Sequence, residues 1–209
     1  MSRNAELKRA ILDFLKISLA PNGFRRSDRI FYRKIPIGRQ ILSVAFHRGQ
    51  DEINVVLNVE IRHDEIENLY SSLVDVKPNS RRATIGAELG KLSSKETMMW
   101  PVAHMSDVPS IGNEILSAFW KIGWPFLTEY AVSEKILDVL LDDGPKGKTF
   151  CVLSDLRAEK ALVAAYVLWK KDNYDSLIDA KLSYLLETKN PYLKAFLEFV
   201  VKFKKLAAD

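Results

Sequence analysis

The chain contains 209 residues, of which 47% are hydrophobic and 28% charged, and its formal net charge is +4. This composition is typical of a soluble globular protein that buries a core in one or two domains. Cys151 is the single cysteine, which excludes an intramolecular disulfide and a zinc site built from paired cysteines.

Two further features concern membranes and secretion. The first residues lack the apolar core of a signal peptide. The longest apolar run covers residues 161–169, whereas a membrane-spanning helix needs about 20 apolar residues. We therefore expect a cytoplasmic protein without a membrane segment.

The first predicted element is an amphipathic helix over residues 4–20. Apolar side chains recur there at three- and four-residue spacing, which is the period of a helix with one buried face. Asn4 is the expected N-cap. Pro21, Asn22 and Gly23 are expected to end the helix, because proline lacks a donor and glycine accepts the left-handed conformation.

Three β-strands are predicted next, over residues 29–35, 40–48 and 53–62. The third strand shows the clearest alternation, because every second residue from Ile53 to Ile61 is apolar. The connections at 36–38 and 49–51 are short, so these strands are expected to be antiparallel neighbours. One face of the sheet is expected to be half polar, with the side chains Ser43, His47, Asn58 and Glu60.

The middle of the chain combines a short helix with weaker strand signals. Residues 64–73 have the apolar spacing of a short helix, and residues 77–80 contain turn-forming residues. Weak alternation makes residues 83–92 a candidate fourth strand, and residues 98–102 are a candidate fifth strand.

The second half of the chain has a helical period. A helix is predicted over residues 111–130, and Gly123 with Pro125 is expected to kink or split it. Ser133 is expected to cap a following helix that ends at Leu141.

Residues 142–147 are polar and contain glycine and proline, so they are the expected flexible boundary. Three helices are predicted after this boundary, over residues 156–171, over residues 174–187, and from an Asn190 cap onward. The predicted fold class is α+β, with an antiparallel sheet of four to five strands packed against helices and a C-terminal helical subdomain. The expected domains are residues 1–143 and 149–209.

The familiar chemical motifs are missing. Residues 142–149 end like a phosphate-binding loop, but Asp142 stands where that loop requires glycine, so nucleotide binding is not expected. The three histidines, His47, His63 and His104, form no metal-ligand pattern, and no nucleophile motif is present. Cys151 lies among apolar residues and is expected to be a buried, inert thiol. We expect no metal and no cofactor.

Positive charge is concentrated at the start of the chain. The first 50 residues contain 11 Lys and Arg but only 3 Asp and Glu. A basic patch attracts phosphate or an acidic protein surface, although charge on a strand can also simply protect a sheet edge from aggregation. The candidate residues for binding a partner or ligand are Arg25, Arg26, Arg29, Arg33, Arg48 and Asn58.

A series of short segments resembles a known family. In chain order they are NGFRR (22–26), FYR (31–33), VAFHR (44–48), VLNVE (56–60), RATIGAEL (82–89), Trp100 and PFL (125–127). The series is similar to the bacterial domain of unknown function 4304 family over about residues 5–143. The chain departs from the family pattern at His47, where glutamine is common, and at Glu60, where glycine is common. The resemblance implies a fold, a bacterial cytoplasmic setting and a binding or immunity role, but no known activity.

Three functional hypotheses follow. The leading one is a non-enzymatic binding protein, such as a regulatory or immunity-type partner of another protein. The alternative is a hydrolase-like enzyme on the half-polar face, with His47 and Glu60 as acid or base and Arg33 or Arg48 holding an anion. The third is weak nucleic-acid binding through the basic stretch at residues 25–48. The missing motifs favour a non-enzymatic role.

Overall fold

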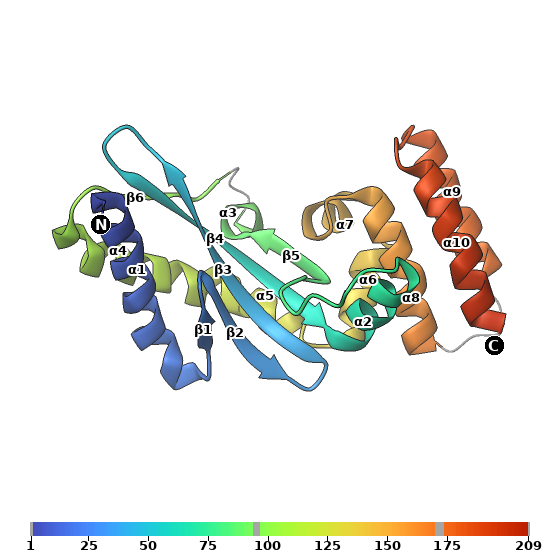
Figure 1. Cartoon of the computed structure of the whole chain (residues 1–209), viewed down its shortest axis with the longest axis horizontal. Helices are drawn as coiled ribbons and strands as arrows, with labels where there is room; N and C mark the ends of the chain where they lie inside the picture. The colour runs from blue at the N-terminus through green and yellow to red at the C-terminus, as the bar shows by residue number, and fades with distance from the viewer. Residues whose placement is uncertain (1, 94–96, 170–173, 209) are drawn as a thin grey trace. The chain divides into compact units, whose positions relative to one another are not determined.

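The computed structural model describes residues 2–93, 97–169 and 174–208, and Figure 1 shows its helices and strands. The N-terminal elements are α1 (Arg3–Leu19), η1 (Ala20–Asn22), β1 (Arg25–Ser27), β2 (Ile30–Ile35), β3 (Gly38–Arg48), β4 (Ile53–His63), α2 (Asp64–Leu73), β5 (Ile85–Glu88), α3 (Leu89–Leu92) and β6 (Trp100–Val102). The later elements are η2 (Met105–Asp107), α4 (Val108–Ala118), η3 (Phe119–Gly123), α5 (Trp124–Glu129), α6 (Ser133–Leu141), α7 (Pro145–Phe150), α8 (Ser154–Trp169), α9 (Asp175–Glu187) and α10 (Leu193–Ala208). The fold is α+β, which confirms the predicted class.

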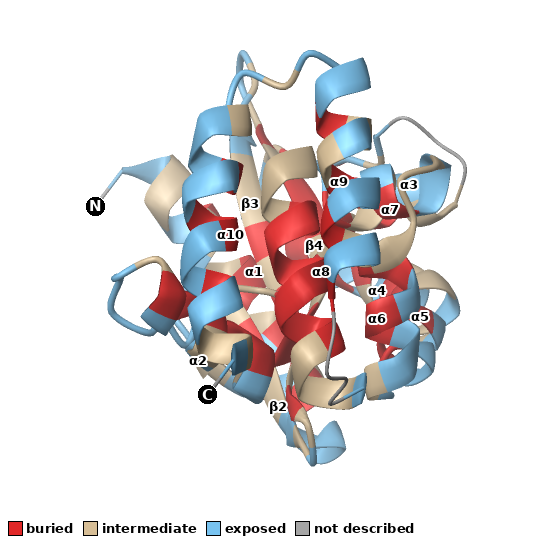
Figure 2. Cartoon of the chain, turned by 90° about the vertical axis from the view of Figure 1, so that its right-hand side faces the viewer, coloured by how far each residue is buried: buried red, intermediate tan, exposed pale blue. Residues whose placement is uncertain are grey.

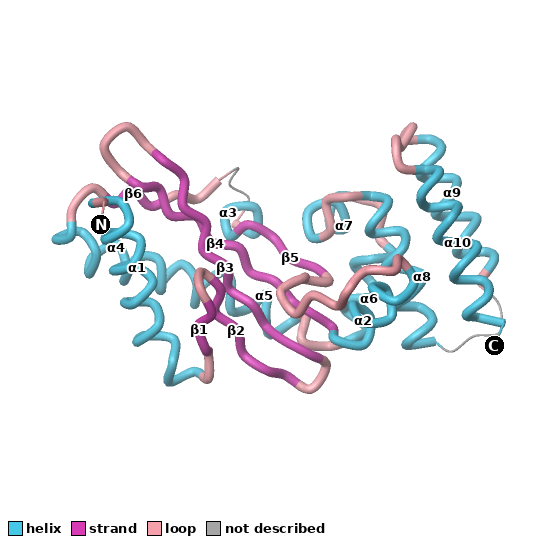
Figure 3. Tube along the Cα trace, viewed as in Figure 1, coloured by secondary structure: helices cyan, strands magenta, loops and turns pink. Residues whose placement is uncertain are grey.

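The sheet has the strand order β1-β2-β3-β4-β5, and β6 pairs with β4 (Figure 3). β2 and β3 pair antiparallel, as predicted from their short connection, and β1 adds an antiparallel pairing with β2. The three long predicted strands are present within a few residues of their expected bounds. β1 was not predicted, and the candidate strand at 83–92 is shorter than expected, because its last four residues form α3.

The chain divides into two compact units. The first contains Met1–Ile61 and Ala87–Ala131, and the second contains Arg62–Gly86 and Val132–Asp209. This division differs from the expected domains at 1–143 and 149–209. The difference arises because both α2 and α6 pack against α8, so they belong with the C-terminal helices.

In the first unit, one face of the sheet forms the core. The inward side chains of β2, β3 and β4 are almost fully buried, including Phe31, Leu42, Leu57, Val59 and Ile61. Each large apolar side chain buried in this way contributes about 1.5–3 kcal/mol relative to an exposed one. Gln40 Nε2 donates to the Leu127 carbonyl at 2.7 Å, which places α5 on this covered face.

The ends of the helices in the first unit follow local chemistry. Gly23 has φ +82°, so it supplies the predicted left-handed stop after η1. The predicted cap at Asn4 is wrong, because α1 starts at Arg3 and Ser2 holds the N-cap position without a side-chain bond. The helix predicted at 111–130 is interrupted by the π-helical turn η3, and Pro125 lies in the first turn of α5, where its missing donor costs no helical bond.

In the second unit, α8 is the central helix. Figure 2 shows this helix largely in the colour of buried residues, and the segment from Arg157 to Ala165 is buried throughout. The predicted cap at Ser133 is wrong, because Ser133 is the first residue of α6 and its hydroxyl lies 3.0 Å from His63 Nε2. Residues 145–147, part of the predicted flexible boundary, belong instead to α7.

Candidate functional site

The second face of the sheet in the first unit is the candidate site, and we call it the open face. The strand register and the alternation of side chains assign it these residues: Arg25, Tyr32, Lys34, Arg39, Ile41, Ser43, Ala45, His47, Asn54, Val56, Asn58 and Glu60. Ala45 is partly exposed there, whereas Ile41 and Val56 are buried, at 1% and 4% exposure. In Figure 1, β2 and β3 lie in front of α5, with no helix of this unit drawn in front of them. Helices therefore cover only one face of these strands.

Three basic residues surround one aromatic ring on the open face. Arg25 pairs with Tyr32 across β1 and β2, while Lys34 pairs with Arg39 across β2 and β3. The Arg39 guanidinium carbon lies 5.8 Å from the centroid of the Tyr32 ring, within the range of a cation–π interaction. Arg25 and Lys34 are exposed. We call Arg25, Tyr32, Lys34 and Arg39 the cationic cluster.

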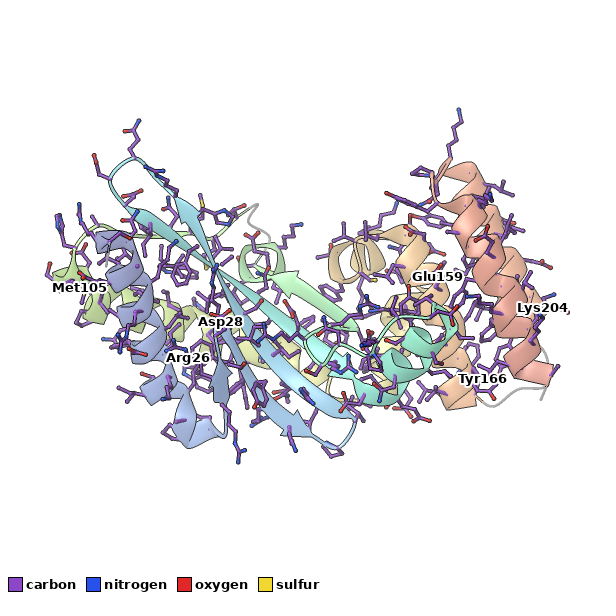
Figure 4. The ribbon with its side chains drawn as sticks, viewed as in Figure 1. Arg26, Asp28, Met105, Glu159, Tyr166 and Lys204 are labelled. Atoms are coloured by element: carbon purple, nitrogen blue, oxygen red, sulfur yellow. The ribbon has the colours of Figure 1, made fainter. Side chains whose placement is uncertain are left out.

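Two of the predicted binding arginines have their charges engaged within the unit. Arg26 Nη1 lies 2.6 Å from Asp13 Oδ1, and its Nε donates to the Asp28 carbonyl at 2.8 Å; Figure 4 labels Arg26 and Asp28. Arg33 Nε donates to Gln40 Oε1 at 2.8 Å. The Arg33 guanidinium also lies 4.5 Å from the Trp124 ring centroid. These arginines anchor β1 and β2 to the helices.

The remaining predicted binding residues lie in different places. Arg29 is exposed in the turn between β1 and β2, and Arg48 is exposed at the end of β3. By strand alternation, Arg48 shares the side of β3 that bears Leu42 and not the open face. Asn58 is half-buried on the open face. The structure thus brings Arg25 into a cluster with Lys34 and Arg39, which lie in the predicted basic stretch at residues 25–48 but were not among the candidate binding residues.

Ser43 and Glu60 form a polar pair on the open face. Ser43 Oγ donates to Glu60 Oε1 at 2.9 Å. Burial raises the pKa of the Glu60 carboxyl, although this hydrogen bond acts in the opposite direction. The predicted half-polar face is therefore present, and Glu60 is the one acidic residue among those assigned to it.

His47 and Glu60 are not brought together. Gly49 N donates to Glu52 O at 3.0 Å, which closes the hairpin between β3 and β4. Counting along both strands from this closure places His47 across from Asn54, six residues from Glu60. At about 3.3 Å per residue the separation is roughly 20 Å, and His47 is exposed. The two side chains lack the geometry that joint acid–base catalysis requires.

The second unit contains buried ion pairs that the sequence argument missed. Lys160 Nζ lies 2.6 Å from Glu67 Oε1, and it donates to the Ala83 carbonyl at 2.7 Å. Asp143 accepts from both Arg157 and Lys181, at 3.2 and 2.8 Å. The one available signal was the presence of charged residues within α8, a helix predicted to be central.

Cys151 and the glycine-containing segment of the second unit fit the sequence interpretation. Cys151 is buried, as predicted, and burial raises the pKa of its thiol. Asp142 accepts from Gly144 N and Gly147 N, both at 2.8 Å, and these bonds lower the pKa of its carboxyl. The side chain at position 142 thus occupies backbone donors that a phosphate-binding loop would offer to its ligand.

The described residues contain no group of three or more His, Cys, Asp or Glu side chains placed to hold a metal ion. In the same part of the chain, every helix is too short or too polar to cross a bilayer. Comparison with known proteins gives no match to a family model, a curated protein or a solved structure.

Proposed function

We propose that this chain is a non-enzymatic binding protein that engages an acidic protein surface through the open face of its sheet. The observation that carries the proposal is the cationic cluster, in which three basic residues surround Tyr32 on a face that no described helix of the unit covers. Because Arg25 and Lys34 are exposed, a partner reaches their charges without displacing any helix.

The chemistry of this face suits a protein partner. Tyr32 offers a rigid amphipathic surface, and tyrosine and arginine are enriched among the residues that dominate binding energy at protein interfaces. The neighbouring polar groups, including Ser43 and Asn58, fit the polar rim of such an interface. Complementary charge also speeds the encounter between partners.

The two other hypotheses have weaker support. A hydrolase that uses His47 and Glu60 is not favoured, because the two residues lie far apart along the strands. Nucleic-acid binding would use the same cluster, but Arg26 and Arg33, which would extend the basic surface, are engaged within the unit. The proposed setting is the bacterial cytoplasm, in keeping with the resemblance to the domain of unknown function 4304 family.

A crosslinking experiment tests the proposal. A photoreactive amino acid is placed at Ala45 on the open face, and in a second protein at Lys16, an exposed residue of α1. Each protein is irradiated in native extract with and without nuclease, and crosslinked proteins are identified by mass spectrometry. We expect a nuclease-resistant crosslink to an acidic protein from position 45 only.

The purified partner is then tested against Arg25→Glu/Lys34→Glu. We expect the reversed charges to slow association at least about tenfold, and to affect dissociation less, because charges at the rim act mainly on encounter. If the crosslinks disappear after nuclease treatment, the open face binds nucleic acid and the proposal of a protein partner fails. Equal crosslinking from both positions, or an unchanged association rate, would overturn it.

A further inference from the structure

The second unit contains a groove lined by both apolar and acidic side chains. Its volume is about 350 Å³, and we call it the acidic groove; its lining residues are Tyr70, Leu73, Val74, Asp155, Glu159, Ala195, Glu198, Phe199 and Lys202. Three carboxylates and one ammonium group therefore share the lining with aliphatic and aromatic side chains. This groove is separate in the chain from the open face, because all of its residues belong to the second unit.

Among the described residues the carboxylates on α8 form no ion pair, although the neighbouring Lys160 charge lowers the pKa of Glu159. Glu159 is only 7% exposed, and its Oε2 accepts a hydrogen bond from the Tyr70 hydroxyl at 2.8 Å; Figure 4 labels Glu159 on α8. Within the described residues, neither Asp155 nor Glu159 has an ion pair with a basic side chain. Lys160, the next residue, is 2.6 Å from Glu67 instead.

The lysine that lines the groove does not neutralise these acids. Lys202 Nζ lies 2.6 Å from Asp75 Oδ2, and Asp75 is outside the groove lining. On the α10 side, Glu198 is 3.9 Å from Lys194, and both side chains are largely exposed. The groove consequently keeps an excess of negative charge.

This arrangement costs stability in the free protein. Asp155 and Glu159 are four residues apart on α8, and like charges at this spacing repel each other on a helix. Burying the Glu159 carboxylate is also unfavourable. Burial, with a smaller contribution from Asp155, raises its pKa, although the Tyr70 hydrogen bond and the Lys160 charge act in the opposite direction. A bound cation would relieve both costs, so the geometry suits a positively charged ligand that also has an apolar part.

We propose that the acidic groove binds a lysine side chain of a basic peptide segment in a partner protein. The ammonium group lies between Asp155, Glu159 and Glu198. The alkyl stem packs against Leu73 and Phe199, two apolar residues of the lining. Lysine buries such a stem along apolar surface while its charged end remains polar.

Lysine fits better than arginine for a geometric reason. The three carboxylates come from two helices, α8 and α10, and so approach the ligand from different sides. An ammonium group has three donors arranged around one nitrogen, whereas a guanidinium presents a planar fork that suits one carboxylate in a bidentate pair. A lysine that belongs to a peptide segment also fits a groove on the surface, because the rest of the peptide chain can lie along it.

Binding of short labelled peptides to the full chain tests the proposal by fluorescence anisotropy. One pool has a fixed central lysine and uncharged polar flanks, and the matched pools have norleucine or arginine at the centre. Norleucine keeps the stem and removes the charge, so we expect it to bind at least about tenfold more weakly than lysine. Asp155→Asn/Glu198→Gln should weaken the lysine pool by a similar factor.

Matched variants keep the experiment decisive. Asp179→Asn/Glu187→Gln removes two exposed carboxylates of α9 that do not line the groove, and it should leave binding unchanged. Glu159→Gln keeps an acceptor for Tyr70 and should also weaken binding, which provides a second test if one groove variant folds poorly. Equal binding of the lysine and norleucine pools would overturn the proposal, as would insensitivity to both groove variants.

Two further results would show that the groove binds a ligand other than a peptide lysine. If free cadaverine displaces the lysine pool at concentrations as low as the unlabelled peptide itself, the groove recognises a free alkylamine, and the peptide proposal fails. If the arginine pool binds as tightly as the lysine pool, the argument from three carboxylates fails. We expect neither result.

Discussion

Lys160 and Glu67 form an ion pair in the interior of the second unit, with 2.6 Å between Nζ and Oε1 and relative exposures of 1% and 0%. Neither oxygen of Glu67 receives a directed hydrogen bond from a described residue. The Lys160 charge is therefore the main compensation for burying this carboxylate. A buried pair of this kind adds little net stability compared with apolar residues, but loss of one partner leaves an uncompensated charge.

Lys160→Met should therefore destabilise the protein strongly. We expect the free energy of unfolding to fall by about 3–5 kcal/mol, because Glu67 stays buried without its cation. Lys160→Met/Glu67→Leu should recover much of this loss. Urea unfolding followed by circular dichroism measures both variants. A double variant no more stable than the single one would show that the pair itself, and not the orphaned charge, carries the stability.

His63 should make stability depend on pH. Burial lowers its pKa below the ordinary value of 6.5, against the opposing effect of Glu65 and Asp64. The unfolded chain therefore takes up a proton at a higher pH than the folded protein, so the contribution of His63 is present above pH 6.5 and is lost as the pH falls through the lowered pKa.

The variant His63→Asn isolates this effect. His63 occupies the N-cap of α2, where its Nδ1 accepts from Ile66 N at 3.4 Å, and asparagine also caps well. Glu159 has a raised pKa and changes stability in the opposite sense on acidification. The measured quantity is therefore the difference between wild type and variant from pH 7.5 to 5. We expect wild type to lose stability relative to the variant; parallel curves would contradict the assignment.

Gly147→Ala should damage the junction between α6 and α7. A Cβ atom at this position would lie 1.7 Å from the Asp142 carbonyl oxygen, so the backbone must move. The bond from Gly147 N to Asp142 would then be strained. We expect a loss of about 1–3 kcal/mol, typical of overpacking. Gly144→Ala is the comparison, since its Cβ would meet only the Asp142 side chain; a smaller effect at 147 than at 144 would contradict the argument.

The arginines of the first unit should separate into structural and surface groups. Arg33→Ala removes the donor to Gln40 and the contact with Trp124, and we expect it to cost about 1–3 kcal/mol. Arg25→Ala changes an exposed side chain and should stay within about 0.5 kcal/mol of wild type. Thermal unfolding of both variants checks the difference. Equal losses would mean that Arg25 also supports the fold.

The long elements could be predicted because their periodicity and their burial agree. In β4 the apolar residues at every second position are all buried, so the alternation indicated both the strand and its covered face. In the same way, α2 occupies Asp64–Leu73, the range that its apolar spacing predicted. Gly23 could be assigned from local chemistry, because few other residues accept its positive φ.

Short and polar features could not be predicted. β1 is only three residues long, so alternation has no length over which to appear. α7 contains two residues that usually break helices, and its start depends on backbone bonds to Asp142. The neighbours of a buried charge come from distant parts of the sequence. An argument that treats charged helix residues as exposed therefore cannot predict the buried ion pair of Glu67 and Lys160.

The cationic cluster shows the same limit at the candidate site. The count of basic residues covered the whole stretch 25–48, but the candidate binding residues included Arg25, Arg26 and Arg33 and left out Lys34 and Arg39. The register instead brings Lys34 and Arg39 beside Tyr32 on the open face, whereas Arg26 and Arg33 contact Asp13 and Gln40. Alternation predicts which residues share a face of one strand, but only the pairing between strands shows which residues become neighbours.

The acidic groove leads to a last prediction about the free protein. Asp155→Asn removes one of two like charges on α8, and the Asp155 carboxylate has no ion pair to lose among the described residues. Asp155 also lies in the first turn of α8, where the helix dipole stabilises a carboxylate, so the effect at one pH does not isolate the repulsion. We expect Asp155→Asn to lose roughly 0.2–0.5 kcal/mol of stability relative to wild type as the pH falls from 7.5 to 5, because the repulsion disappears when Glu159, whose pKa is raised, takes up a proton.

Asp179→Asn is the matched control for this pH dependence, because Asp179 is exposed on α9 and outside the groove. It should show no such dependence. Urea unfolding of both variants at pH 7.5 and pH 5 separates the two cases. An effect of Asp155→Asn that is the same at both pH values would mean that the two carboxylates do not repel each other in the free protein, and the groove would then not be held in a strained state that a cation relieves.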